Sequence, residues 1–213
     1  MKNLAFLFFA CSAILLAFSC KDKDDDATTT PIPATDYFPL TAGSYWIYNW
    51  VKIDTLGNET PQVRMDTVTV VGDTVVNGLN YSIVEGTVFG GGVRHIYRDS
   101  SGYLVEAAGG TAEFSVSLNI ALGNDTTWIG DMPAFWTSES MDVEPASVTV
   151  PAGTFESCLV KIQTIYPLEF DIPAGNRIYP YHYAKGVGLV KYRTSFLSSF
   201  DYLEARLSDY HIK

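Results

Sequence analysis

The sequence is poor in positive charge and in cysteine. It contains 14 lysine and arginine residues against 24 aspartate and glutamate residues, and its formal net charge is −10. A chain this acidic has no basic stripe for nucleic acid, and charge does not draw it to anionic lipid. Of the three cysteines, Cys11 and Cys20 belong to the N-terminal segment, so Cys158 stands alone in the remainder. We therefore expect no disulfide within the mature protein and a fold that rests on apolar burial.

The sequence also lacks a helical hydrophobic period and a catalytic motif. No segment keeps a 3.6-residue period over the length that a stable helix needs. His95, His182 and His211 are widely spaced, and neither they nor Cys158 form a metal-ligand or nucleophile pattern. The position of Cys158 in an apolar strand predicts an inert core thiol. We predict no catalytic residue, no metal and no cofactor.

Residues 1–19 have the features of a secretory signal peptide. Lys2 precedes an apolar run from Leu4 to Phe18, which is shorter than the roughly 20 residues needed to cross a bilayer. The segment Leu16-Ala17-Phe18-Ser19-Cys20 resembles a bacterial lipoprotein cleavage box. It predicts that Cys20 becomes the lipidated first residue and anchors the protein to a membrane. The alternative is an ordinary cleaved signal without lipid.

Residues 20–35 contain almost nothing to bury. A Lys/Asp block is followed by a Thr/Pro-rich stretch, a composition that predicts a disordered tether. The acidic block resembles the surface-export signal of Bacteroidota lipoproteins, which favours the outer membrane and its cell-surface face. A solvated spacer facing the periplasm is the alternative. Residues 36–213 are long enough for one domain with a sizeable core.

Short alternating strands and turn signals fill residues 36–213 and predict a single all-β domain. The hairpin signals are Asn77-Gly78, the pair of segments 93–98 and 103–106, and Pro151-Ala152-Gly153. Asn-Gly should place Val76 opposite Leu79, and Gly153 should adopt a positive φ. The segment 113–122 reads as one half-buried strand, and 128–136 as irregular. The predicted fold is an antiparallel meander that forms a curved sheet, half-barrel or sandwich.

Three groups of side chains have a predicted face. In the strand 45–53 both faces are apolar, which predicts a strand covered on both sides. After the turn at Gly153, the alternation predicts that Thr154, Cys158, Val160 and Ile162 face the core. Two aromatic rows are open to interpretation either as core or as a ligand-contacting surface, and we favour core for both. These rows are Trp46, Tyr48 and Trp50, and Tyr179, Tyr181 and Tyr183.

Three longer segments carry a family resemblance. They read YFPLTAGSYW over residues 37–46, VPAGTFESC over 150–158 and YAKGVGLVK over 183–191. With these segments in this order, the chain resembles a widespread type of uncharacterised Bacteroidota lipoprotein. The resemblance implies an all-β lipoprotein without an established activity, so it assigns no catalytic residue. The architecture is more distantly similar to half-barrel lipid carriers of the outer membrane.

The sequence supports three functional hypotheses. The first is a non-enzymatic binding or scaffolding domain of the cell envelope, anchored to the membrane by lipid and binding a glycan or an apolar small molecule. The second is a carrier that holds an acyl chain or other apolar ligand in a curved sheet. The third is a glycan-directed hydrolase. An apolar cavity would favour the carrier, an exposed aromatic strip would favour sugar binding, and a cleft with converging acids or histidine would favour an enzyme.

Overall fold

The computed structural model describes residues 31–168, 175–196 and 199–213. Residues Pro31–Lys213 form one compact unit. The predicted signal peptide, Cys20 and most of the predicted tether lie outside the described residues. In the part of the chain that is described, no helix has both the length and the apolar character needed to span a bilayer.

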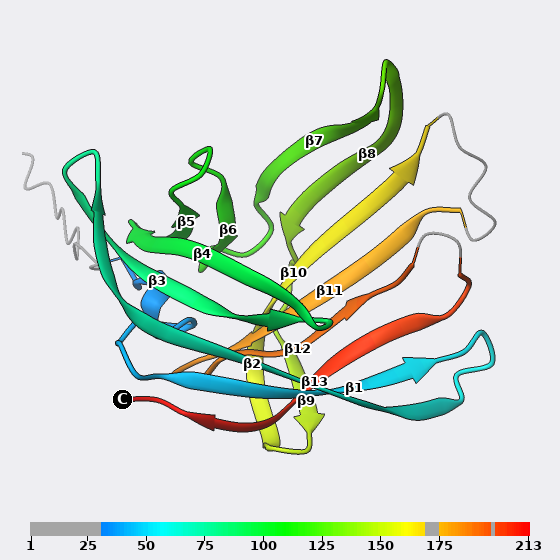
Figure 1. The fold of residues 1–213 in the computed structure, drawn as a ribbon, viewed down its shortest axis with the longest axis horizontal. Coiled ribbons are helices and arrows are strands. Elements are labelled where there is room, and N and C mark those ends of the chain that lie inside the picture. The colour runs from blue at the N-terminus through cyan, green and yellow to red at the C-terminus, as the bar shows by residue number, and fades with distance from the viewer. Residues whose placement is uncertain (1–30, 169–174, 197–198) are drawn as a thin grey trace, which may run out of the picture. The chain divides into compact units, whose positions relative to one another are not determined.

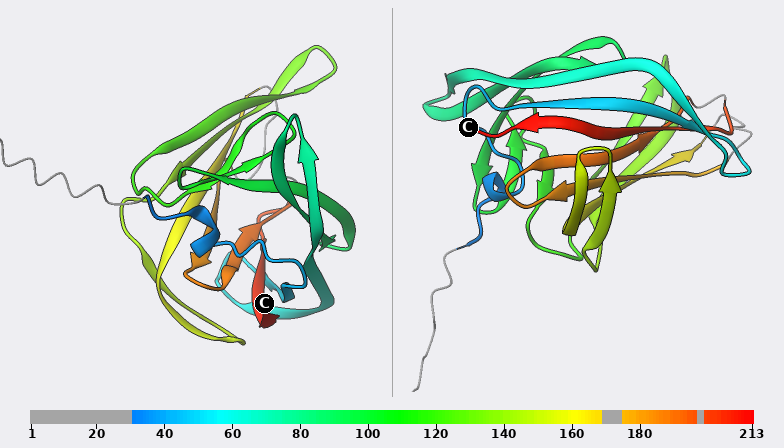
Figure 2. Two further views of the ribbon diagram at one scale, coloured as in Figure 1. Left: turned by 90° about the vertical axis from the view of Figure 1, so that its left-hand side faces the viewer. Right: turned by 90° about the horizontal axis from the view of Figure 1, so that it is seen from below.

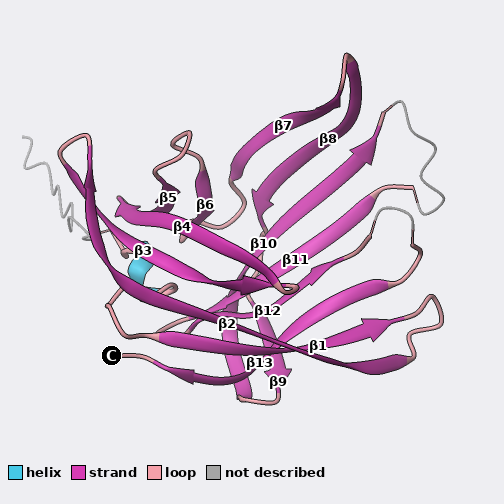
Figure 3. Ribbon diagram, in the orientation of Figure 1, coloured by secondary structure: helices cyan, strands magenta, loops and turns pink. Residues whose placement is uncertain are grey.

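The described residues form antiparallel strands almost throughout (Figures 1 and 3). A short 3-10 turn, η1 (Ala34–Asp36), precedes them. The strands are β1 (Tyr45–Ile53), β2 (Glu59–Val76), β3 (Leu79–Val88), β4 (Gly91–Ser100), β5 (Tyr103–Glu106), β6 (Ala112–Ser115), β7 (Ala121–Ile129), β8 (Met132–Met141), β9 (Ala146–Val150), β10 (Gly153–Pro167), β11 (Arg177–Ala184), β12 (Gly188–Thr194) and β13 (Tyr202–His211). The predicted all-β, antiparallel class is confirmed.

The strands form two meanders that share one seam. Their order in the sheet is β6-β5-β4-β3-β2-β1-β13-β12-β11-β10-β8-β7, with β9 paired to β10 outside this path. Strands β1 to β6 therefore make one half and β7 to β13 the other. The halves are joined by pairing of β1 with β13, which runs from Tyr45 opposite His211 to Ile53 opposite Tyr202.

The sheet curls so that its edge strand β6 contacts strands in the middle of the other half. Lys161 Nζ on β10 lies 2.8 Å from Glu113 Oε1 on β6. The rings of Phe114 on β6 and Tyr183 on β11 stack with centroids 4.4 Å apart. The sheet is thus a nearly closed barrel, and its concave face forms the interior.

The segment before β1 closes one end of this interior (Figure 2). Phe38 stacks on Trp46 at 5.1 Å and meets Tyr97 edge to face at 6.0 Å. The backbone of Asp36 accepts a hydrogen bond from Gly186 N at 2.6 Å, in the turn between β11 and β12. We call the end covered by residues 33–44 the closed end.

Two of the segments that carry the family resemblance meet at the closed end. Trp46 Nε1 donates to the carbonyl of Val187 at 2.6 Å. Gly188 has φ +111°, and a Cβ at this position would lie 3.0 Å from Trp46 Nε1. The segment 183–191 therefore needs a glycine where the indole packs against its backbone. The third segment forms the β9–β10 hairpin, in which Ala152 N donates to the carbonyl of Leu207 on β13.

The predicted hairpins are confirmed. Val76 pairs with Leu79 around Asn77-Gly78, and β4 pairs with β5. The turn Pro151-Ala152 joins β9 to β10, and Gly153 has φ +143° as predicted.

The prediction of one strand over residues 113–122 is wrong. β6 ends at Ser115 and β7 begins at Ala121, because the chain leaves one edge of the sheet there and joins the other. Asn119, with φ +52°, donates its backbone N–H to Asp142 O in this link. Apolar residues do alternate along this segment, but its first part belongs to edge strand β6 and its last part to edge strand β7.

The segment 128–136 is regular, contrary to the prediction. It lies within the β7–β8 hairpin, whose turn is Gly130-Asp131. Trp128, Ile129 and Met132 flank the turn and are about half exposed. Because neither face of this hairpin tip is buried, its residues do not alternate between apolar and polar. The sequence therefore contains no strand signal here.

The predicted burial of both faces of β1 is half correct. Trp46, Tyr48 and Trp50 are buried on the concave face, at 0%, 3% and 1% exposure. The other face is only half-buried, and Asn49 is exposed. The favoured core interpretation of the three aromatic residues is confirmed, while cover on the convex face is incomplete.

Residues 158–161 of β10 are buried on both faces of the strand, which corrects the predicted alternation. Cys158 and Val160 are buried as expected, but Leu159 and Lys161 are equally buried, Ile162 is only half-buried and Thr154 is exposed. Leu159 and Lys161 pair with Tyr183 and Tyr181, whose side chains line the interior. A bulge between Phe155 and Cys158, with Ser157 at φ +54°, interrupts the alternation.

Candidate functional site

An apolar cavity of about 240 Å³ occupies the barrel interior. Its walls come from β1 to β6 on one side and from β11 and β12 on the other, with the closed-end segment contributing one ring. The lining residues are Phe38, Tyr48, Val68, Val84, Val88, Val93, His95, Tyr97, Leu104, Glu113, Tyr181, Tyr183, Leu189 and Tyr192. Such a lining suits the apolar part of a small molecule, because aliphatic and aromatic side chains dominate and few polar groups interrupt them.

Hydrogen bonds and ring stacking hold several tyrosines of this lining in place. Tyr48 donates to the carbonyl of Leu189 at 2.7 Å, and the rings of Tyr181 and Tyr192 stack in parallel at 5.7 Å. Burial raises the pKa of Tyr181 and of Tyr192 well above the ordinary value, so both stay protonated and neutral. The walls therefore combine apolar rings with neutral hydroxyl groups.

Three of the six predicted aromatic candidates line the cavity, and the other three are buried outside its lining. Tyr48, Tyr181 and Tyr183 line the cavity. Trp46 and Trp50 are buried beside it, and Tyr179 is buried with its hydroxyl 2.8 Å from Ser195 Oγ. Neither row is an exposed platform: Tyr179 and Tyr183 are buried, and Tyr181 is half-buried and faces the cavity.

A buried carboxylate holds the β3–β4 turn against the interior. Asp66 accepts hydrogen bonds from Trp50 Nε1 at 2.6 Å, from Phe89 N at 2.5 Å and from Gly90 N at 3.1 Å. Burial by itself raises the pKa of Asp66, but the hydrogen bonds from Trp50, Thr87 and the two turn amides outweigh it and lower the pKa. Asp66 is therefore ionised at neutral pH and fixes the turn.

Phe89 completes this corner of the interior. Its ring meets Trp50 edge to face at 5.2 Å and Phe196 at 5.5 Å. Its neighbour Val88 lines the cavity. The turn thus forms part of the cavity wall rather than a free surface loop.

The concave face becomes polar at β10, around Lys161. This side chain is 3% exposed, and its Nζ lies 2.8 Å from Glu113 Oε1 and 3.8 Å from Glu139 Oε1. Nζ also lies 4.6 Å from the centre of the Tyr181 ring. Gln163 donates to Glu139 Oε1 at 2.6 Å. We call Lys161, Glu113, Glu139 and Gln163 the Lys161 cluster. Because the ammonium has carboxylate and ring partners, its burial is compensated.

A polar cleft of about 410 Å³ lies beside the Lys161 cluster. Side chains of β7, β8 and β10 line it, together with the residue before β6. The lining residues are Thr111, Gly123, Asn124, Asp125, Thr137, Glu139 and Gln163. Tyr181 of the apolar cavity donates to Gln163 Oε1 of the cleft at 3.4 Å. The two hollows therefore share a wall made by the Lys161 cluster and Tyr181.

Sequence reasoning missed the Lys161 cluster. The alternation placed Lys161 and Gln163 on the solvent side of β10, and nothing in the local sequence pairs Lys161 with Glu113. The available signal was a lysine and a glutamine on the same face of a strand rich in β-branched residues. Only the curl of the sheet brings β6 across to them.

The structure does not bring Cys158 and the histidines together into one site. Cys158 is buried, and this burial raises the pKa of its thiol to about 11. Burial lowers the pKa of His182 to about 4. His95 Nδ1 lies 2.8 Å from Glu106 Oε1 at the cavity, whereas His211 stacks on Tyr45. Among the described residues, no cluster of three or more histidine, cysteine and acidic side chains has the arrangement of a metal site.

Comparisons with solved structures reveal this architecture in two proteins. One is described as exported, with a YmcC-like fold, and comes from Bacteroides fragilis NCTC 9343; its TM-score is 0.52 at 14% identity, over 83% of this chain and 99% of that one. The fold is YmcC-like. The other is described as a lipoprotein from Parabacteroides distasonis ATCC 8503, with a TM-score of 0.50 at 14% identity, over 83% and 98% of the two chains. No protein-family model matches the sequence, and neither does any curated protein.

Proposed function

We propose that this protein is a non-enzymatic binding protein of the bacterial envelope that holds the apolar part of a small molecule inside its barrel. The observation that carries the proposal is the cavity of about 240 Å³ lined by apolar and aromatic side chains. Of the functions considered from the sequence, the carrier is the one that such a cavity favours.

The proposal includes the location. The cleavage box before Cys20 and the acidic tether support a lipid anchor, outer-membrane attachment and a cell-surface position. The exported protein and the lipoprotein that share the fold support an envelope location. The three segments at residues 37–46, 150–158 and 183–191 support membership of the Bacteroidota lipoprotein family that they resemble.

The carrier has stronger support than the hydrolase. Hydrolysis of a glycoside requires one carboxylic acid that donates a proton and a second carboxylate at a suitable separation. Glu113 and Glu139 both contact the Lys161 ammonium. Two carboxylates that share one buried cation suit a structural or recognition role better than acid catalysis.

Binding of the uncharged apolar fluorophore N-phenyl-1-naphthylamine tests the proposal. The protein is the mature chain with Cys20→Ser, which carries no acyl chain and is purified without detergent. We expect the fluorescence of the probe to rise on binding, and native mass spectrometry to detect any ligand that co-purifies. The variant Val93→Trp places a large side chain in the cavity, because Val93 lines it and is half-buried.

Val75→Trp is the matched control, because Val75 is 64% exposed and does not line the cavity. We expect Val93→Trp to weaken probe binding at least tenfold, and Val75→Trp to leave it unchanged, while both variants keep the wild-type circular dichroism. Equal binding in the wild type and in a folded Val93→Trp variant would refute the carrier proposal. So would the absence of both probe binding and a co-purified ligand.

A further inference from the structure

We propose that the polar cleft receives an uncharged, hydroxyl-rich head group of an amphiphile whose apolar part lies in the cavity. The inference rests on the proposed function and adds the chemical class of the ligand. It is carried by the side chains of the cleft, by their charge and by the shared wall between the two hollows.

The two hollows are neighbours on either side of one row of side chains. Tyr181 lines the cavity and Gln163 lines the cleft, and the two side chains are hydrogen-bonded at 3.4 Å. Lys161 contacts Glu113 of the cavity and Glu139 of the cleft. A ligand that spans this wall has its apolar portion among aromatic rings and its polar portion among amides, hydroxyls and carboxylates.

The cleft offers both donors and acceptors to a head group. Asn124 and Gln163 carry amides, Thr111 and Thr137 carry hydroxyls, and Glu139 adds a carboxylate. Sugar-like hydroxyl groups are donors and acceptors at once, so they can pair with all three kinds of side chain. A purely apolar head would leave these groups without partners in a partly enclosed site, which is unfavourable.

The charge of the cleft disfavours an anionic head. Neither lysine nor arginine is among its lining residues, while Asp125 and Glu139 are. The nearby cation, Lys161, is already paired with Glu113 and Glu139. A phosphate or carboxylate head would therefore meet carboxylates without a cation of its own.

A quaternary ammonium head is disfavoured for a different reason. It has no hydrogen-bond donor or acceptor, so it would leave the amides and hydroxyls of the cleft unpaired. Glu139 is already paired with Lys161 and Gln163. A neutral, hydroxyl-rich head group can pair with the amides and hydroxyls.

Competition among amphiphiles with a common decyl chain tests this inference. Decyl maltoside, decanoate and decyltrimethylammonium are titrated, each below its critical micelle concentration, against the protein with bound N-phenyl-1-naphthylamine. We expect decyl maltoside to displace the probe at a concentration at least tenfold lower than either charged amphiphile. A charged amphiphile that competes as well as the maltoside, or better, would overturn the inference.

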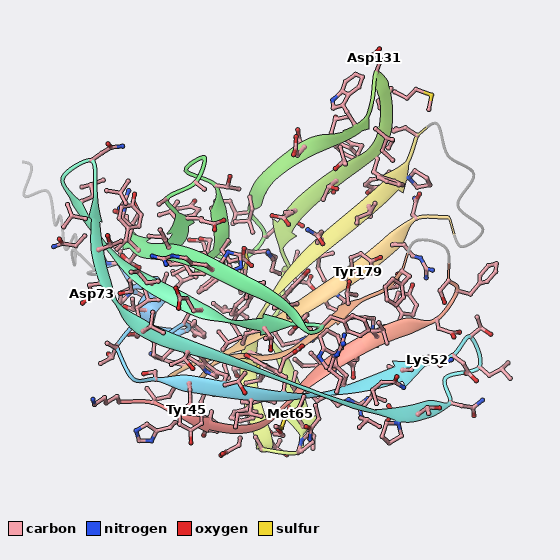
Figure 4. All side chains as sticks on the ribbon, in the orientation of Figure 1. Tyr45, Lys52, Met65, Asp73, Asp131 and Tyr179 are labelled. Atoms are coloured by element: carbon pink, nitrogen blue, oxygen red, sulfur yellow. The ribbon has the colours of Figure 1, made fainter. Side chains whose placement is uncertain are left out.

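Two variants, each of which removes one negative charge, test whether the charged head groups are disfavoured by the cleft itself. Asp125→Asn removes one carboxylate from the cleft, so decanoate should gain about three- to tenfold in affinity, as expected when a like charge nearby is removed, while decyl maltoside changes little. Asp131→Asn makes the same chemical change at the tip of the β7–β8 hairpin (Figure 4) and should alter neither affinity. Equal effects of the two variants would place the head group outside the cleft.

The outcomes also separate this inference from the proposed function. If the probe binds and Val93→Trp weakens it, but the three amphiphiles compete equally, the cavity binds apolar molecules and the head-group inference is wrong. If neither the probe nor decyl maltoside binds, as checked directly by calorimetry, both proposals are wrong.

Discussion

Replacing Asp66 by Asn should destabilise the fold at neutral pH, and this loss should diminish in acid. The carboxylate accepts from Trp50 Nε1 and from the amides of Phe89 and Gly90. In Asp66→Asn, the remaining oxygen can still accept from Trp50 Nε1 and Phe89 N, which share one carboxylate oxygen, but the amide NH₂ then faces the N–H of Gly90. The variant loses a charge-assisted hydrogen bond, which contributes about 1.5–3 kcal/mol, and leaves a buried donor without a partner, which costs about 1–3 kcal/mol. We expect a total loss of about 3 kcal/mol.

The pH dependence follows from the lowered pKa of Asp66 in the folded state. A carboxyl group with a depressed folded pKa stabilises the protein above its unfolded pKa, which is about 3.9 for Asp. This contribution is lost as pH falls through the folded pKa. The asparagine does not titrate, so the stability difference between wild type and variant should be constant from about pH 5 to 7 and should decline below about pH 4.

Urea unfolding followed by tryptophan fluorescence measures the difference across this pH range. Asp73→Asn is the control, because Asp73 lies on the same strand but is exposed and accepts a hydrogen bond from Ser82 Oγ at 2.8 Å that an asparagine can also accept. It should change the free energy of unfolding by less than about 0.5 kcal/mol. A loss below about 1 kcal/mol in Asp66→Asn at pH 7, or a difference that stays constant down to pH 3, would refute the reasoning.

Four further predictions concern single residues. Trp50→Ala should cost about 3–5 kcal/mol in urea unfolding, because a fully buried indole is lost; a loss below about 1 kcal/mol would contradict its place in the core. Gly153→Val should cost about 1–3 kcal/mol because valine is strained at φ +143°, and an unchanged urea midpoint would argue against that strain. Cys20→Ser should release the protein from membranes on fractionation; continued association with the outer membrane would exclude the lipid anchor. Cys158 should react with a thiol reagent many times more slowly at pH 8 than in urea, because burial raises the pKa of its thiol to about 11; equal rates would show that it is accessible.

Local features of the fold were predictable because their determinants are neighbours in sequence. Asn77-Gly78 and Pro151-Ala152-Gly153 specify tight turns through backbone conformation alone. The strand 45–53 has the predicted bounds, since its aromatic and β-branched residues favour extended backbone.

The candidate site was not predictable because it depends on the curl of the sheet. Which face of β10 points inward is decided by strands far away in sequence, and a buried Lys161 gives the same local pattern as an exposed one. Its partner Glu113 lies on β6, which the sequence merged with β7. The hydrogen bond between Trp50 and Asp66 likewise joins two strands whose alternation alone does not fix their register.

The seam between β1 and β13 has a consequence for the order in which the protein folds. Every other neighbouring pair in the sheet lies within one meander, so the two halves can form from contacts close in sequence. Pairing of β1 with β13 requires the last strand, and so does the contact of Lys213 N with Ser44 Oγ at 3.2 Å. Such non-local pairing is slow compared with hairpin formation. Until it occurs, β1 and β13 each present an unpaired edge that can recruit other chains, so the interval between formation of the two halves and closure of the seam is when aggregation threatens this protein most.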